Sequence, residues 1–408
     1  MKKVVFTLGL CLVTIVSFGQ KKAVTDALKL AKDSKPNFAE ARALIKGALT
    51  NPETKDDPKT WFTAGQIESL QFDQENTKQM LQQQPDEAVM YNALLAVYPY
   101  FLEAYKLDNL PDAKGKVKPK YVKDIKSILR ANLPYYINGG GYYFEQKDFR
   151  KALECFNQTV EVIDNPFMKD GATITPGDST YLYANYYGAI AAAQLDDHEL
   201  AVKAMTRASK TDFKQNDVYQ YLSEEYSRVK DTLNWEKTLN EGLALFPNEE
   251  FFIFRLIGIY IDSDRNTKAL EYIQAAIKNN PDNAQLFHVA GRIYELGLKD
   301  YDKAEENFKK SIQLNGENAE THFDLGRIYF NQGVLKMDEA NEIADVKKYN
   351  EEKEKAKELY KKAMPYLETA LKLDPDTPGL KVALRSIYYN LDMEDKFNEI
   401  SALMNISN

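Results

Sequence analysis

Residues 253–281, IFRLIGIYIDSDRNTKALEYIQAAIKNNP, contain the pattern that decides the fold of this 408-residue chain. Eight positions in this stretch follow successive spacings of 3, 1, 3, 9, 4, 3 and 5 residues: Ile253, Leu256, Ile257, Tyr260, Ala269, Ile273, Ala276 and Pro281. Spacings of three and four place apolar side chains on one face of a helix. The stretch therefore predicts two amphipathic helices joined by a turn and closed by a proline, which cannot continue a helix.

The same register recurs along the chain. It appears 34 residues earlier as Tyr219, Leu222, Ser223, Tyr226, Trp235, Leu239, Gly242 and Pro247. The following copy begins at Phe287 and carries one extra residue between its two helices. Gly291 and Gly326 fall in mid-helix, where glycine costs ~1 kcal/mol relative to alanine. We therefore expect a second helix to cross closely against each glycine, and each hairpin to bury its apolar face by stacking on its neighbours.

This unit resembles the tetratricopeptide repeat (TPR), which has an aromatic residue, Leu, Gly and Tyr in its first helix and Ala, an aromatic residue and Pro in its second. The resemblance implies an all-α, TPR-like α-solenoid of stacked antiparallel helix hairpins, wound as a right-handed superhelix. We count about nine hairpins, of which five or six follow the register closely. As a class, TPR proteins act in assembly and scaffolding by binding proteins or peptides.

The N-terminus has the three-part pattern of a secretory signal peptide. Two lysines precede an apolar run over residues 4–16, and Ser17-Phe18-Gly19 supplies small residues before Gln20. The run is shorter than the ~20 residues that span a bilayer. We predict a signal peptide over 1–19, cleavage between Gly19 and Gln20, and export to the periplasm or cell envelope. A lipoprotein anchored at Cys11 and an uncleaved membrane anchor are the weaker alternatives.

Prolines, glycine and an insertion divide the rest of the chain. Degenerate helical repeats are expected over 20–110, a linker over 111–119 and the TPR array over 120–408. Residues 334–362 interrupt the array with eight basic and eight acidic side chains at helical spacing, which predicts a charged helical hairpin with its turn at Tyr349-Asn350. This insertion is either a solvated spacer or a partner-docking arm.

Charge and cysteine content exclude several classes of function. The formal net charge is −8, and an acidic surface repels the phosphate backbone of nucleic acids. After removal of the leader, Cys155 is the single thiol, so an internal disulfide or a cysteine zinc site is not expected. Its place in a helical run predicts a small buried side chain. No transmembrane segment is expected in the mature chain.

No catalytic or cofactor motif accompanies the repeats. The three histidines, His198, His288 and His322, lack ligand clusters at metal-binding spacing, so structural or groove-lining roles are favoured. His288 and His322 lie in consecutive first helices and are candidates for neighbours. Residues 139–141 are three glycines that suggest a phosphate cradle, but they lie inside a predicted helix, where close helix packing is expected. We predict no enzyme activity, no cofactor and no metal.

The resemblance places the first helices on the concave face of the array. The positions that point into this groove in TPR proteins are occupied by Tyr183, Tyr186, Phe251, Phe254, His288, Arg292, Phe323, Arg327, Phe330 and Tyr389. Aromatic and arginine side chains dominate binding hot spots, and arginine pairs with carboxylates through two hydrogen bonds. The Lys/Asn-rich clamp of chaperone-binding TPR domains is absent. For each aromatic residue, packing between helices is the alternative.

The leading hypothesis is an exported, non-enzymatic scaffold that binds a protein or peptide partner and associates with complexes in the envelope. The leader and the divergent repeats resemble envelope TPR proteins of Bacteroidota-type bacteria. Carbohydrate capture is the alternative, because exposed aromatic rings stack on sugars. The chain lacks the lipid-anchor cysteine and the large ligand lobe of glycan-binding lipoproteins with TPR-like helices. An enzyme is the second alternative.

Overall fold

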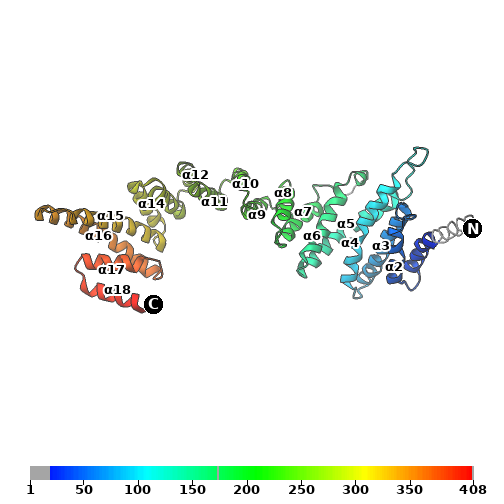
Figure 1. The fold of residues 1–408 in the computed structure, drawn as a ribbon, viewed down its shortest axis with the longest axis horizontal. Helices are drawn as coiled ribbons and strands as arrows, with labels where there is room; N and C mark the ends of the chain where they lie inside the picture. Colours follow the sequence, from blue (N-terminus) through cyan, green and yellow to red (C-terminus); the bar gives the residue numbers. More distant parts are fainter. Residues whose placement is uncertain (1–18, 172–173, 407–408) are drawn as a thin grey trace, which may run out of the picture. The chain divides into compact units, whose positions relative to one another are not determined.

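The computed structural model describes residues 19–171 and 174–406, so all of the predicted signal peptide except Gly19 lies outside the described residues. Within these ranges the secondary structure is helical, with no strand (Figure 1). A first helix covers 19–32. The labelled elements that follow are α2 (Phe38–Thr50), α3 (Pro58–Met80), α4 (Glu87–Asp108), α5 (Val122–Glu145), α6 (Phe149–Asp164), η1 (Pro166–Met168), α7 (Ser179–Ala193), α8 (His198–Ala208), α9 (Gln215–Arg228), α10 (Thr232–Leu245), α11 (Glu250–Asp262), α12 (Asn266–Asn279), α13 (Ala284–Arg292), η2 (Ile293–Leu298), α14 (Tyr301–Leu314), α15 (Ala319–Asn341), α16 (Val346–Leu373), α17 (Leu380–Asn390) and α18 (Glu394–Ile406).

The chain forms two compact units, residues 1–235 and 236–408, which we call the N-unit and the C-unit. In the described part of the N-unit, the hairpins are 19–32 with α2, α3 with α4, α5 with α6, and α7 with α8, and α9 packs on α8. In the C-unit they are α11 with α12, α13 with α14, α15 with α16, and α17 with α18. The expected pair of α9 and α10 spans the division. The predicted all-α fold of stacked helix hairpins is confirmed.

The predicted linker over 111–119 lies in the non-helical connection between α4 and α5, inside the N-unit. One hydrophobic cluster contains residues from both sides of this connection, including Phe101 before it and Tyr136 after it. Cys155 is fully buried in the same cluster, as its sequence context predicts, and this burial raises the pKa of its thiol. No described helix combines the length and the apolar character that crossing a bilayer requires.

Mid-helix glycines mark the points of closest approach between the two helices of a hairpin. A Cβ atom added at Gly291 would lie 2.6 Å from Cδ1 of Phe308, and one at Gly326 would lie 2.6 Å from Cγ of Leu367. Both distances are below ordinary van der Waals contact. The expectation that a second helix crosses against these glycines is therefore confirmed.

The single extra residue in the unit beginning at Phe287 has a structural counterpart. The first helix of this hairpin changes from α-helix to π-helix over Ile293–Leu298 (η2). A π-helix closes i→i+5 hydrogen bonds and appears mostly where one turn of an α-helix is widened. The wider turn accommodates the extra residue, so the second helix still places Ala304 fully buried at its repeat position.

The charged insertion forms the end of α15 and the first part of α16, two long helices that pack against each other (Figure 1). The predicted turn at Tyr349-Asn350 is wrong: the helices are joined by residues 342–345, and Tyr349 lies inside α16. The carboxylate of Asp345 accepts a hydrogen bond from the backbone N–H of Lys348, which caps the start of α16. This N-cap starts the helix earlier than the tyrosine-asparagine pair suggested.

Candidate aromatic binding pocket

A cavity of about 490 Å³ in the N-unit is lined mainly by the first helices of successive hairpins, α5, α7 and α9. Its lining consists of Ile137, Gly141, Phe144, Glu145, Phe156, Tyr183, Tyr186, Tyr187, Ile190, Lys214 and Tyr221. Pockets of this size, mostly apolar with a few polar groups, are typical ligand sites. We call this cavity the aromatic pocket.

Three tyrosines present both ring surface and hydroxyl groups at the aromatic pocket. Tyr183, Tyr187 and Tyr221 are 41%, 40% and 47% exposed. Their hydroxyl groups make no hydrogen bond with any residue of the described chain. Each can therefore donate to or accept from a ligand without breaking an existing contact, while its ring offers apolar surface.

Tyr186 has a different role, because it is 7% exposed and forms part of the pocket wall. Its hydroxyl donates to Oδ2 of Asp217 at 3.3 Å. Burial raises the pKa of Tyr186 to about 12, and the Asp217 carboxylate acts in the same direction. Its ring meets Tyr187 edge-on, with ring centres 5.1 Å apart and an interplanar angle of 81°. This packing holds the exposed Tyr187 ring in place.

Lys214 supplies the positive charge of the aromatic pocket. Its Nζ lies 5.1 Å from the centre of the Tyr186 ring, within cation–π range. Its φ is +46°, a left-handed conformation that an L-residue other than glycine seldom adopts. Among the other described non-glycine residues, positive φ occurs in the turn inside a hairpin, as at Asp196, Lys230 and Asp264, whereas Lys214 lies between two hairpins. Such uncommon conformations concentrate at functional sites.

The three consecutive glycines of α5 divide into two groups. A Cβ at Gly139 would lie 2.9 Å from Cδ1 of Tyr91, and one at Gly140 would lie 2.5 Å from Cε1 of Phe156. A Cβ at Gly141 would meet no atom within 4 Å. The packing expectation is therefore confirmed for the first two glycines and wrong for Gly141, which lines the aromatic pocket and leaves it open.

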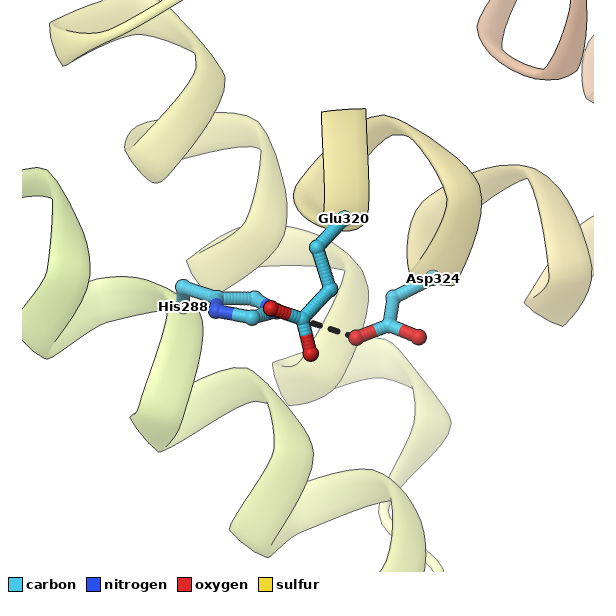
Figure 2. A group of neighbouring side chains, drawn as sticks. All are labelled: His288, Glu320 and Asp324. Atoms are coloured by element: carbon cyan, nitrogen blue, oxygen red, sulfur yellow. Dashed lines mark hydrogen bonds and ion pairs between the residues drawn. The ribbon is translucent and has the colours of Figure 1, made fainter. Parts of the chain in front are cut away.

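A second group of polar residues lies in the C-unit. Figure 2 shows His288, on α13, facing Glu320 and Asp324, one turn apart on α15. Nε2 of His288 lies 3.0 Å from Oδ2 of Asp324, and the potential ligand atoms of all three residues lie within 4.8 Å of one another. An imidazole with two carboxylates is a donor set that suits a divalent transition metal.

Arginines already neutralise these carboxylates. Arg292 donates to Glu320 at 3.0 Å, and Arg327 donates to Asp324 at 2.9 Å and to Glu295 at 3.0 Å. Glu295 is 4% exposed, and burial raises its pKa. Because each carboxylate has a guanidinium partner, the arrangement is an ion-pair network that joins two successive hairpins. We call it the His288 network.

The structure brings only some of the ten predicted groove residues together. Tyr183 and Tyr186 line the aromatic pocket. His288 and Arg327 belong to the His288 network, Arg292 reaches it through Glu320, and Arg327 also covers the Phe323 ring at 5.9 Å. The four others lie outside both groups in the described structure: Phe251, Phe254, Phe330 and Tyr389.

The other histidines have separate partners. His322 contacts the carbonyl oxygen of Gly316 through Nε2 at 3.0 Å, while His288 engages Asp324, so no contact pairs the two histidines. His198 lies 2.9 Å from Glu225. Sequence reasoning also missed Tyr187, Tyr221 and Lys214, because the groove positions of the repeat register do not include them.

Comparisons with known proteins agree with the repeat register. A family model described as tetratricopeptide repeat matches residues 284–318 and 355–377. No curated protein is significantly similar in sequence to this chain.

Among solved structures, MamA from Desulfovibrio magneticus RS-1 is 14% identical with a TM-score of 0.36, covering 48% of this chain and 97% of MamA. TTC0263, a thermophilic TPR protein from Thermus thermophilus, is 18% identical with a TM-score of 0.33, covering 51% and 99%. YrrB, a TPR protein with an unusual peptide-binding site, is 17% identical with a TM-score of 0.34, covering 48% and 92%. The two segments that the family model matches lie in helix hairpins of the C-unit, so the chain contains tetratricopeptide repeats over residues 284–318 and 355–377.

Proposed function

We propose that this chain is a non-enzymatic scaffold that holds a peptide segment of a protein partner in the aromatic pocket. The observation that carries the proposal is the set of three half-exposed tyrosines with free hydroxyls around a cavity of about 490 Å³. Tyrosine is enriched among the residues that dominate binding energy, and a rigid aromatic wall loses little entropy on binding.

The lining defines the chemistry of the peptide. An aromatic or large aliphatic side chain fits against Phe144, Phe156 and Ile190, while the tyrosine hydroxyls pair with the peptide backbone. Lys214 favours an acidic residue or a free carboxylate beside that apolar anchor. The expected recognition element is therefore a short segment with one bulky apolar residue and a neighbouring negative charge.

Selection from a random peptide display library tests this function. Peptides retained by the wild-type protein should share the anchor and the acidic neighbour, and they should be lost on a Gly141→Leu variant, whose added side chain enters the pocket. Gly258→Leu is the matched control, because Gly258 is also a helical glycine with no atom within 4 Å of an added Cβ. Peptides retained equally by both variants would contradict the proposal.

Carbohydrate capture remains the competing function, since the exposed faces of Tyr183, Tyr187 and Tyr221 also suit sugar rings. A glycan array separates the two. If the protein binds a glycan, if Tyr183→Ala abolishes this binding, and if the display library yields no peptide, the ligand of the aromatic pocket is a carbohydrate and not a peptide.

We also propose that the protein is exported and works in the cell envelope, in association with other proteins. Support comes from the basic start, the apolar run over 4–16 and the small residues before Gln20. N-terminal sequencing of the protein from its native host should begin at Gln20. An intact Met1 would contradict cleavage of the leader.

A further inference from the structure

The N-unit contains a second cavity, of about 450 Å³, formed mainly by second helices of two successive hairpins, α6 and α8. It shares no lining residue with the aromatic pocket. Its lining consists of Leu153, Asn157, Glu161, Leu200, Lys203, Ala204, Thr206, Arg207 and Lys210. We call it the basic cavity, because three of its nine lining residues are cations in a chain whose net charge is −8.

The three cations are placed for joint action. Lys203, Arg207 and Lys210 follow each other at spacings of four and three residues, which puts them on one face of α8 and the turn after it. None of them forms an ion pair with a carboxylate within 4.0 Å in the described chain. Many other lysines of the described chain do, including Lys151 with Asp148 and Lys126 with Asp170.

Arg207 is the central group of the basic cavity. Its Nη2 donates to Oδ1 of Asn157 at 2.8 Å, which fixes the guanidinium against α6. Its Nε is buried and has no hydrogen-bond partner. Burial lowers the pKa of Arg207, because desolvation disfavours the charged form. A buried donor without a partner costs free energy that an anionic acceptor would recover.

The carboxylates around the basic cavity do not cancel its charge. Glu161 is part of the lining, and Asp164 lies on the next turn of α6, where it accepts a hydrogen bond from the Tyr181 hydroxyl at 3.2 Å. Both act on Arg207 electrostatically without pairing with it. Three cations therefore face at most two carboxylates, and an apolar surface of Leu153, Leu200 and Ala204 lies beside them.

We infer that the basic cavity is a binding site for a small organic anion, with a phosphate or carboxylate group on Arg207 and the two lysines and an apolar body on the leucines. Guanidinium groups bind such oxyanions through charge-assisted hydrogen bonds, and lysines add electrostatic attraction. The site is independent of the peptide proposed for the aromatic pocket.

Calorimetric titration of the purified mature chain with inorganic phosphate, phenyl phosphate and hexanoate tests the inference. At least one probe should bind, and binding of phenyl phosphate rather than hexanoate, or the reverse, identifies the anionic group. A Lys203→Gln/Lys210→Gln double variant should weaken binding about tenfold or more, as expected for losing charge-assisted contacts. Both lysines are exposed, so this variant should fold normally.

A Lys114→Gln/Lys116→Gln variant is the matched control, because it removes the same charge from the exposed connection between α4 and α5. Its affinity should equal that of the wild type. The inference would be overturned if none of the three probes binds at millimolar concentration, or if the control variant loses as much affinity as the cavity variant. Arg207→Gln, checked for folding by circular dichroism, should lose binding most strongly.

Discussion

The ammonium nitrogen of Lys214 lies 5.1 Å from the centre of the Tyr186 ring, and the lysine holds this position with a φ of +46°. The cation thus rests on a buried ring whose hydroxyl is tied to Asp217. The contact joins the start of α9 to α7 and places a positive charge beside the exposed tyrosines of the aromatic pocket. Lys214 therefore keeps a backbone conformation that lysine seldom adopts at the edge of the proposed binding pocket.

Replacing Lys214 with asparagine removes the positive charge and keeps the backbone conformation, because asparagine tolerates the left-handed region. We expect stability to change by no more than about 1 kcal/mol, the range of an exposed cation–π contact. Peptides with an acidic neighbour should bind several-fold more weakly, and uncharged peptides should be unaffected. Fluorescence polarisation with both kinds of peptide measures this difference, and equal losses for both would show that Lys214 only shapes the pocket.

Replacing the neighbouring glycines Gly140 and Gly141 of α5 with alanine should change the stability of the protein in opposite directions. Gly140→Ala pushes a methyl group toward Phe156, and overpacking of this kind costs about 1–3 kcal/mol. Gly141→Ala meets no atom within 4 Å and should stabilise the helix by up to about 1 kcal/mol. Urea denaturation followed by circular dichroism measures both midpoints. A stabilising Gly140→Ala would show that the hairpin does not pack as closely as described.

Two arginines of the C-unit should differ in their contribution to stability. Arg327→Ala leaves the carboxylates of Asp324 and Glu295 without their guanidinium partner, and removing one partner of a buried pair costs about 3 kcal/mol. Arg292 pairs with Glu320 where both side chains are about half exposed, so Arg292→Ala should cost at most about 1 kcal/mol. Equal urea midpoints for the two variants would show that the His288 network does not stabilise the fold.

The charged arm formed by the ends of α15 and α16 should be dispensable for folding. Replacing residues 334–358 with the native turn of residues 342–345 keeps the close contact of the hairpin between Gly333 and Tyr360. The melting temperature, measured by circular dichroism, should fall by no more than a few degrees. A collapse of the melting temperature would show that the buried Ala340 and Ala356 of the arm belong to the core.

The repeat register predicted the helices well because it reports a local property, the spacing of apolar and small residues along a helix. Ala269, Ala304 and Ala363 are fully buried at their register positions, and even the single extra residue near Tyr294 has a local structural effect, the π-helix. The turn of the arm was misplaced because the capping strength of Asp345 outweighs the helix-breaking tendency of Asn350.

The binding site was less predictable because it depends on contacts between repeats. His288 is 1% exposed and not available to a groove, since its partner Asp324 lies 36 residues away on the next hairpin. Gly141 differs from Gly140 only in direction around the helix, about 100° per residue, which three identical letters do not reveal. Tyr221 joins Tyr183 only through the packing of α9 beside α7.

The central claim is that a peptide side chain occupies the aromatic pocket. Its most direct test is the dissociation constant of one selected peptide, measured by fluorescence polarisation for the wild type, Gly141→Leu and Gly258→Leu. We predict that Gly141→Leu raises the dissociation constant at least about tenfold, a loss of about 1.4 kcal/mol, while Gly258→Leu leaves it unchanged. Equal dissociation constants for all three proteins would contradict the claim.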